Sequence, residues 1–166
     1  DEMKEMLPAD EDAKRMARQT FTLSEFLEQK VDAFTYPTLH RRAIVHGHCH
    51  HKAIMKMADD VKVLDAIGLD YEMLDSGCCG MAGSFGFERE HYGVSMQVGE
   101  LVVLPSVRRA PKDTLLIADG FSCREQIAQT TDRRALHLAE VLQMAMEDGP
   151  SGPSGDYPER TCLADY

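Results

Sequence analysis

Two adjacent cysteines, Cys78 and Cys79, are the residues of this chain best suited to chemistry. Neighbouring side chains normally diverge, so two thiols that serve one site require an irregular backbone. Gly77 and Gly80 flank the pair, and glycine allows such a backbone because it tolerates positive φ angles. Two further cysteines, each just past an apolar run, lie in comparable settings: Cys49 and Cys123. Four thiols in this pattern are typical of a metal or iron–sulfur site.

The composition is that of one globular domain. The chain has 166 residues, of which 43% are hydrophobic and 28% charged, and this is enough for a packed core. Its formal net charge of −10 argues against a nucleic-acid partner, because phosphate binding needs clustered Lys and Arg. No apolar run is long enough to cross a bilayer, so we expect no transmembrane segment.

Cysteine usage and the N-terminal residues predict a cytoplasmic protein. Residues 1–4 are acidic and lack the apolar stretch of a signal peptide. The chain has five cysteines and is too large to need disulfides for its stability. Clustered cysteines in such a chain are typical of metal-binding or redox residues in a reducing compartment. Because the chain begins with Asp1 rather than methionine, we expect a piece of a longer protein.

Short apolar runs alternate with helical patterns along the chain. We predict strands at 43–45, 71–74 and 114–118. After an irregular lead-in at 1–8, helices are predicted at 10–30, 53–57, 60–67, 88–103, 123–127 and 135–146, and Pro105 is expected to break the fourth. This order predicts an α/β fold, a small parallel sheet with helices on both faces in three layers, α/β/α. The predicted domain covers 1–148, and a Pro/Gly/Ser-rich tail covers 149–166.

The predicted topology carries the four thiols to one place. Cys49 follows the first strand, the vicinal pair follows the second and Cys123 follows the third. In open parallel sheets, sites form beyond the carboxyl ends of the strands. The glycine-rich turn at 77–86 also bares backbone N–H groups, which stabilise thiolates and cluster sulfides. The sequence therefore predicts one anionic metal centre at this edge of the sheet.

These motifs resemble the cysteine-rich, or CCG, domain family. The family includes the heterodisulfide reductase catalytic subunit and the iron–sulfur subunits of glycolate oxidase, lactate-utilisation enzymes and anaerobic glycerol-3-phosphate dehydrogenase. Its pattern is a Cys, then Cys-Cys-Gly, then Cys-x-x-Cys, and here Cys49, Cys78-Cys79-Gly80 and Cys123 occupy those positions. Three segments match most closely the C-terminal region of FAD-linked D-2-hydroxyglutarate dehydrogenase-like oxidoreductases, namely 46–53, 75–86 and 122–127.

The resemblance implies electron transfer within a larger enzyme. A flavin in an upstream FAD domain would oxidise a 2-hydroxy acid of the D-2-hydroxyglutarate, D-lactate or glycolate type. An iron–sulfur cluster would then pass electrons towards a quinone or another acceptor. The resemblance also implies an upstream ferredoxin-like domain and an upstream first copy of the CCG domain. The domain itself would hold no catalytic residue, and a membrane-associated acceptor would make the protein cytoplasmic or peripheral to the inner membrane.

The chain departs from the family pattern at Gly120, where the first Cys of the final Cys-x-x-Cys would stand. The noncubane cluster implied by the heterodisulfide reductase relatives uses five thiolates, so one ligand is missing here. The four cysteines present can still hold a cubane [4Fe–4S] cluster or a zinc ion: Cys49, Cys78, Cys79 and Cys123.

Other interpretations stay open. The thiols could form a structural zinc site in an interaction module of a larger oxidoreductase, since zinc has no redox chemistry. One vicinal cysteine could instead be a nucleophile with His48 or His50 as its base. Each cysteine could also be a small buried hydrophobic residue.

Four histidines surround Cys49, and we expect them to differ in role. His48 and His50 are predicted to hydrogen-bond around the metal ligands, together with Gly77 and Gly80. His46 and His51 are expected only to orient the turn through hydrogen bonds. Cys162 stands alone in the polar tail, and we do not expect it to be a ligand.

Overall fold

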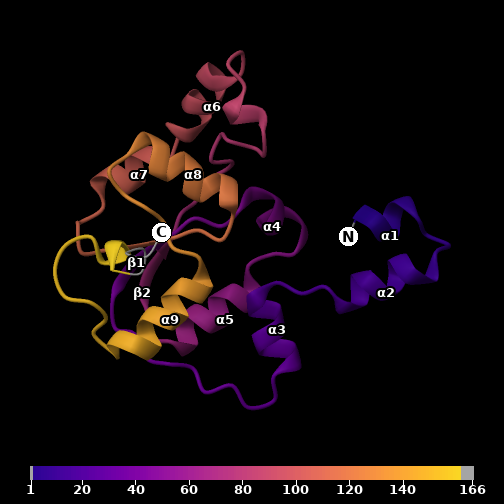
Figure 1. The fold of residues 1–166 in the computed structure, drawn as a ribbon, viewed down its shortest axis with the longest axis horizontal. Helices are drawn as coiled ribbons and strands as arrows, with labels where there is room; N and C mark the ends of the chain where they lie inside the picture. The colour runs from indigo at the N-terminus through magenta and orange to yellow at the C-terminus, as the bar shows by residue number, and fades with distance from the viewer. Residues whose placement is uncertain (1, 162–166) are drawn as a thin grey trace. The chain divides into compact units, whose positions relative to one another are not determined.

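Three parallel strands lie at the centre of the fold in a computed structural model of the chain, which describes residues 2–161 (Figure 1). They are β1 (Arg42–Val45), β2 (Asp70–Met73) and β3 (Leu115–Ile117), in the order β2-β1-β3. The register pairs Val45 with Met73 on one side and with Ile117 on the other. The three predicted strands and their parallel arrangement are confirmed.

A short extended segment adds to the free side of β3. Leu136 forms a parallel bridge with Ile117, donates its N–H to Leu116 O at 2.8 Å and accepts from Ala118 N at 2.9 Å. The helix predicted to start at 135 therefore starts later, as α9 (Leu138–Asp148). His137 caps it, because its side chain accepts from the backbone N–H of Ala139.

Helices connect the strands and cover both faces of the sheet. They are α4 (Cys49–Ile54) and α5 (Ala58–Ala66) after β1, η1 (Phe85–Phe87), α6 (Tyr92–Gly99) and α7 (Val103–Arg109) after β2, and α8 (Phe121–Thr130) after β3. Figure 1 shows α7 and α8 on one side of the strands, and α5 and α9 on the other. The predicted three-layer α/β/α fold is confirmed. Within the described residues, no helix has the length and apolar character needed to cross a bilayer.

The helix predicted over 88–103 is shorter in the structure, where α6 covers only Tyr92–Gly99 and a separate helix, α7, starts at Val103. The backbone leaves helical geometry at Val102, which has a φ of −141° and a ψ of −52°. Val102 is the N-cap residue of α7. Pro105 then lies in the first turn of α7, where its missing N–H would have no intrahelical partner in any case. Proline at this position starts a helix rather than ending one.

The described residues up to Phe34 form a compact unit of their own, distinct from the unit that starts at Thr35. It contains α1 (Glu2–Met6), α2 (Glu11–Gln19) and α3 (Leu23–Lys30), so the irregular lead-in and the single helix at 10–30 are both wrong predictions. The break arises at Thr22, which has extended geometry and shares a capping box with Glu25. The reciprocal hydrogen bonds satisfy donors at the start of a new helix.

The described part of the Pro/Gly/Ser-rich segment packs on the second unit. Its short helix η2 (Pro158–Arg160) carries Glu159, whose Oε1 lies 2.7 Å from Arg133 Nε. The Arg133 side chain is 3% exposed and that of Glu159 is 1% exposed, so this ion pair is buried. The domain boundary expected at residue 148 stays a prediction about the longer protein.

Candidate metal centre

The structure brings the four predicted cysteines together at the carboxyl edge of the sheet. Cys49 opens α4 directly after β1, the vicinal pair follows β2, and Cys123 lies in the first turn of α8 after β3. Cys79 and Cys123 share a hydrogen bond, and Cys78 shares one with Cys49. All four are free thiols. The local cause is the parallel sheet, since three strands that end at one edge deliver their following residues to one place.

Burial divides the four thiols into two pairs. Cys79 and Cys123 are 2% and 1% exposed and belong to an apolar cluster with Leu116 and Ile127, among others. Cys49 and Cys78 are half-buried. Water is therefore largely excluded from one side of the site and has access to the other.

Hydrogen bonding sets the protonation of the inner pair. The Cys123 thiol donates to Cys79, and this lowers the pKa of Cys79 to about 4 against the opposing effect of burial. The same hydrogen bond, together with burial, raises the pKa of Cys123. The pair therefore holds one proton at neutral pH, with the thiolate on Cys79. Burial raises the pKa of Cys78, so Cys78 is less acidic than Cys79.

A histidine joins the inner pair. A ring nitrogen of His46 and the Sγ atoms of Cys79 and Cys123 all lie within 4.8 Å of one another, and all three residues are buried. The nearby His46 side chain is also one of the causes that lower the pKa of Cys79. The sequence pattern predicted for His46 only a role in the turn, yet its place directly after β1 is the same signal that identified the cysteines. A histidine at a strand end is as good a candidate ligand as a thiol there.

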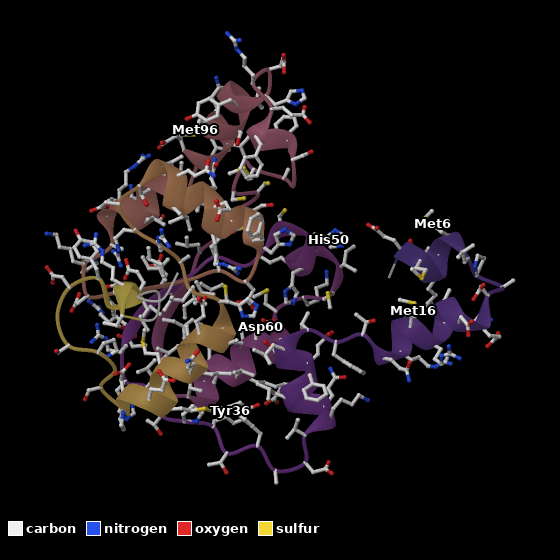
Figure 2. All side chains as sticks on the ribbon, viewed as in Figure 1. Met6, Met16, Tyr36, His50, Asp60 and Met96 are labelled. Carbon is white, nitrogen blue, oxygen red and sulfur yellow. The ribbon has the colours of Figure 1, made fainter. Side chains whose placement is uncertain are left out.

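The remaining predicted site residues lie further out. His48 is half-buried and faces Gly120, and burial lowers its pKa. His50, labelled on α4 in Figure 2, is exposed, and its ring centroid lies 6.5 Å from that of His48. The supporting roles proposed for these two histidines stay predictions. Cys162 lies outside the described residues.

The two glycines around the vicinal pair differ. Gly80 has a φ of +97°, and a Cβ there would meet the carbonyl oxygen of Ser95. The Gly80 N–H also points at Cys78 Sγ, 3.3 Å away. Gly77 does not have a positive φ, and open space surrounds it, so the irregular backbone expected at Gly77 is a wrong prediction. One glycine, not two, is required by the backbone here.

At Gly120, where the family pattern has a cysteine, the His48 ring fills the space that a side chain would need. A Cβ at Gly120 would lie 2.7 Å from His48 Cδ2 and 3.0 Å from Cys123 Sγ. A larger side chain at Gly120 would therefore displace the His48 ring. The glycine at position 120 is therefore what allows His48 to pack where it does.

A lysine contact and a helix N-terminus lie in the segments that carry the thiols. The Lys52 ammonium donates to the carbonyl oxygen of Ser76, next to the glycine-rich turn. The first turn of α8, which carries Cys123, presents the positive end of that helix dipole. A helix N-terminus at Cys123 stabilises a thiolate and an anionic centre.

The donor set fits a metal. Thiolate and imidazole are the ligands that zinc and iron prefer in proteins. The Nε2 atom of His46 is buried and has no conventional hydrogen-bond partner among the described residues. A buried polar atom of this kind is costly unless something binds it. A metal held by His46, Cys79 and Cys123 would satisfy it.

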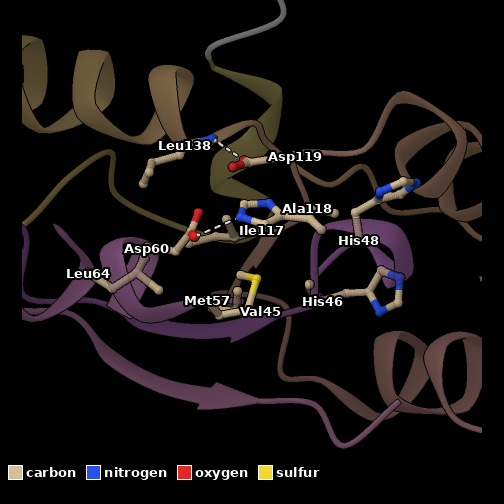
Figure 3. A pocket seen from close by; sticks show the side chains of 12 residues that line it. Val45, His46, His48, Met57, Asp60, Leu64, Ile117, Ala118, Asp119 and Leu138 are labelled. Atoms are coloured by element: carbon tan, nitrogen blue, oxygen red, sulfur yellow. Dashed lines mark hydrogen bonds and ion pairs between the residues drawn. The ribbon is translucent and has the colours of Figure 1, made fainter. Parts of the chain in front are cut away.

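A small cavity lies beside the centre, between β1, β3 and α5 (Figure 3). Its volume of about 20 Å³ is room for a single water. On one wall His51 Nε2 lies 3.2 Å from Asp60 Oδ2. On another, Asp119 Oδ1 accepts from the N–H of Leu138 at 2.8 Å, the second dashed line in Figure 3. The cavity is too small for an organic substrate.

The chain is similar to parts of three kinds of curated proteins. It is 30% identical over 106 residues to one of the subunits of the anaerobic glycerol-3-phosphate dehydrogenase of Escherichia coli, covering 63% of this chain and 26% of that protein. It is 30% identical over 98 residues to D-2-hydroxyglutarate dehydrogenase of the same organism, covering 58% of this chain and 10% of that protein. It is 31% identical over 144 residues to lactate utilization protein A of Geobacillus kaustophilus, covering 79% of this chain and 57% of that protein.

The chain thus spans about a quarter of the first of these relatives and a tenth of the second. No family profile and no solved structure matches it. All three kinds of relative belong to protein groups whose cysteine motifs this chain resembles. The resemblance is confirmed, and the chain is a homologue of proteins that bear the cysteine-rich CCG domain.

Proposed function

We propose that this chain is the iron–sulfur electron-transfer domain of a flavin-dependent 2-hydroxy-acid dehydrogenase. The observation that carries the proposal is the gathering of four free thiols from three strand ends at one edge of the sheet. In this proposal Cys49, Cys78, Cys79 and Cys123 hold the cluster, which supplies one-electron chemistry when bound.

The surroundings of the thiols suit this role. The apolar cluster around Cys79 and Cys123 limits water on the inner side, and burial is one of the factors that tune the potential of a cluster. The Gly80 N–H near Cys78 Sγ supplies a hydrogen bond to sulfur, which is another. The half-buried side at Cys49 gives electrons a short route to and from a partner.

The larger enzyme is part of the proposal. An FAD domain and a ferredoxin-like domain would lie upstream, the flavin would oxidise a hydroxy acid of the D-2-hydroxyglutarate, D-lactate or glycolate type, and electrons would pass to a quinone or another acceptor. Similarity to D-2-hydroxyglutarate dehydrogenase and to lactate utilization protein A supports this context. The domain alone would not oxidise substrate, and the enzyme would be cytoplasmic or peripheral to the inner membrane.

One observation favours a second candidate, a structural zinc site. The ligand atoms of His46, Cys79 and Cys123 lie within 4.8 Å of one another. Four ligands about 2.3 Å from a tetrahedral ion lie roughly 3.8 Å apart, so this compact group suits a single metal ion. The domain would then stabilise a larger oxidoreductase without carrying electrons.

Anaerobic purification followed by reconstitution with iron and sulfide tests the proposal. The expected protein is brown, contains iron and acid-labile sulfide in stoichiometric amounts, and bleaches reversibly on reduction. The variant C79S/C123S should lose this colour and C162S, the matched control, should keep it. A colourless protein with stoichiometric zinc overturns the electron-transfer role in favour of the second candidate. A protein that takes up neither metal overturns both.

A further inference from the structure

His46 is held rigidly at the edge of the sheet. It follows the last residue of β1, and its backbone N–H donates to Ile117 O of β3 at 2.8 Å. Its side chain is only 2% exposed. The backbone position of His46 is therefore fixed by the central strands rather than by the turn that follows.

One nitrogen of the ring is committed to a hydrogen bond. His46 Nδ1 lies 2.8 Å from Ser76 Oγ, and this contact is buried. The contact joins the end of β1 to the segment that follows β2. It leaves Nε2 as the nitrogen available to the thiols. A metal-bound histidine is oriented in the same way, because its second ring nitrogen almost always makes a hydrogen bond that fixes the ring.

The other nitrogen has no conventional partner. His46 Nε2 is fully buried and makes no hydrogen bond to nitrogen or oxygen within residues 2–161. Two sulfur atoms, Cys79 Sγ and Cys123 Sγ, form with the ring a group whose ligand atoms all lie within 4.8 Å. One imidazole nitrogen and two cysteine sulfur atoms in one buried group supply three of the four ligands of a tetrahedral metal site.

We propose that His46 binds the metal of this centre directly, so that the centre has mixed imidazole and thiolate ligands. The inference rests on the proposed function only in requiring that the site holds a metal. It goes beyond that function by adding a ligand that is not a cysteine, in a chain that has Gly120 where a fifth cysteine would stand.

The ligand changes what the centre can do. An imidazole is neutral where a thiolate is negative, so its use makes the centre less anionic by one charge. In iron–sulfur centres, replacing cysteine by histidine on one iron raises the reduction potential. A centre with His46 as ligand should therefore accept electrons more readily than a centre bound by cysteine alone.

His48 provides a matched comparison. It is two residues away in the same loop, it is half-buried, and its ring packs against Gly120. It does not belong to the group of ligand atoms around Cys79. If proximity to the thiols were enough to make a histidine a metal ligand, replacing His46 and replacing His48 would have the same effect on metal binding.

The test uses the full chain, reconstituted anaerobically with iron and sulfide, in four forms: wild type, H46Q, H46C and H48Q. Pulsed electron paramagnetic resonance of the reduced protein, with and without ¹⁵N-labelled histidine, detects a nitrogen bound to the metal. We expect nitrogen coupling in wild type and H48Q, and its loss in H46Q. H46C should keep a cluster and have a more negative midpoint potential than wild type. Circular dichroism of the metal-free variants checks that each is folded.

Two results overturn the inference while leaving the proposed function intact. One is a wild-type cluster without histidine nitrogen coupling, and the other is coupling that persists in H46Q. If the wild type binds zinc instead, Co²⁺ replaces it as the spectroscopic probe, and the same variants and the same nitrogen coupling decide the question. A wild-type chain that takes up no metal overturns both the proposed function and this inference.

Discussion

The thiols of Cys79 and Cys123 share one hydrogen bond at the carboxyl edge of the sheet, although one residue follows β2 and the other follows β3. The bond makes Cys79 the acidic partner, and it makes Cys123 the partner that keeps its proton. In the metal-free protein this pair is a preformed half-site. A metal that displaces one proton from Cys123 gains two thiolates at once.

The first prediction concerns this pair in the metal-free protein. The pKa of Cys79 is lowered from 9.0 to about 4, so ultraviolet thiolate absorbance should persist at pH 6 in wild type and be lost in C79S. A depressed folded-state pKa gives stability that is complete above the unfolded value and is lost as the pH falls towards 4. Chemical unfolding of wild type and C79S between pH 5 and pH 8 checks this, and equal pH dependence in both proteins would contradict it.

The second prediction concerns Ser76, which positions His46 without touching the metal itself. Replacing it by alanine removes the hydrogen bond to His46 Nδ1. We expect S76A to weaken metal binding by about 10- to 100-fold, because partners of metal-bound histidines have effects of this size. Competition with a chelator measures the affinity. S84A, a change in the same glycine-rich segment, is the control and should bind like wild type.

The third prediction separates the two glycines beside the vicinal cysteines. G80A places a Cβ against the Ser95 carbonyl at a φ of +97°, so we expect a loss of more than about 2 kcal/mol in the free energy of unfolding. G77A meets open space and should change that free energy by less than about 0.5 kcal/mol. Denaturant unfolding of both variants measures the difference. Equal effects would mean that the backbone at Gly80 relaxes.

The fourth prediction concerns the buried ion pair of Arg133 and Glu159. Replacing Glu159 by glutamine leaves the Arg133 charge buried without its partner, although Arg133 Nη2 keeps its bond to Thr114 O at 2.6 Å. We expect E159Q to lower the free energy of unfolding by about 3 kcal/mol, as for other broken buried pairs.

An exposed ion pair supplies the control for that measurement. Arg42 and Asp70 are 74% and 79% exposed and lie 3.4 Å apart, so D70N should leave the unfolding midpoint unchanged within error. A wild-type midpoint in E159Q would show that the tail contributes nothing to the stability of the second unit.

The strands and the gathering of cysteines were predictable from sequence because both depend on local signals. The strands at 43–45, 71–74 and 114–118 are short apolar runs, and each is followed by residues suited to a site. The rule that parallel strands end at one edge then brings Cys49, the vicinal pair and Cys123 together. No long-range information beyond strand direction is needed.

Other features depended on partners far away in the chain. The separation of α6 from α7 arises at the backbone of Val102, and the extended segment at Leu136 exists because it pairs with β3; helical spacing encodes neither feature. Glu159 is buried because Arg133 meets it, and a charged residue in a polar tail carries no local sign of this.

By itself the sequence determined the α/β class, the parallel sheet and the gathering of the four cysteines at one edge, since these follow from residue type and from spacing along the chain. Only the tertiary structure decided that His46 faces the thiols while His50 faces solvent. The physical reason is that the direction of an imidazole ring is set by its hydrogen-bond partner. For His46 that partner is Ser76, which belongs to the segment after a different strand.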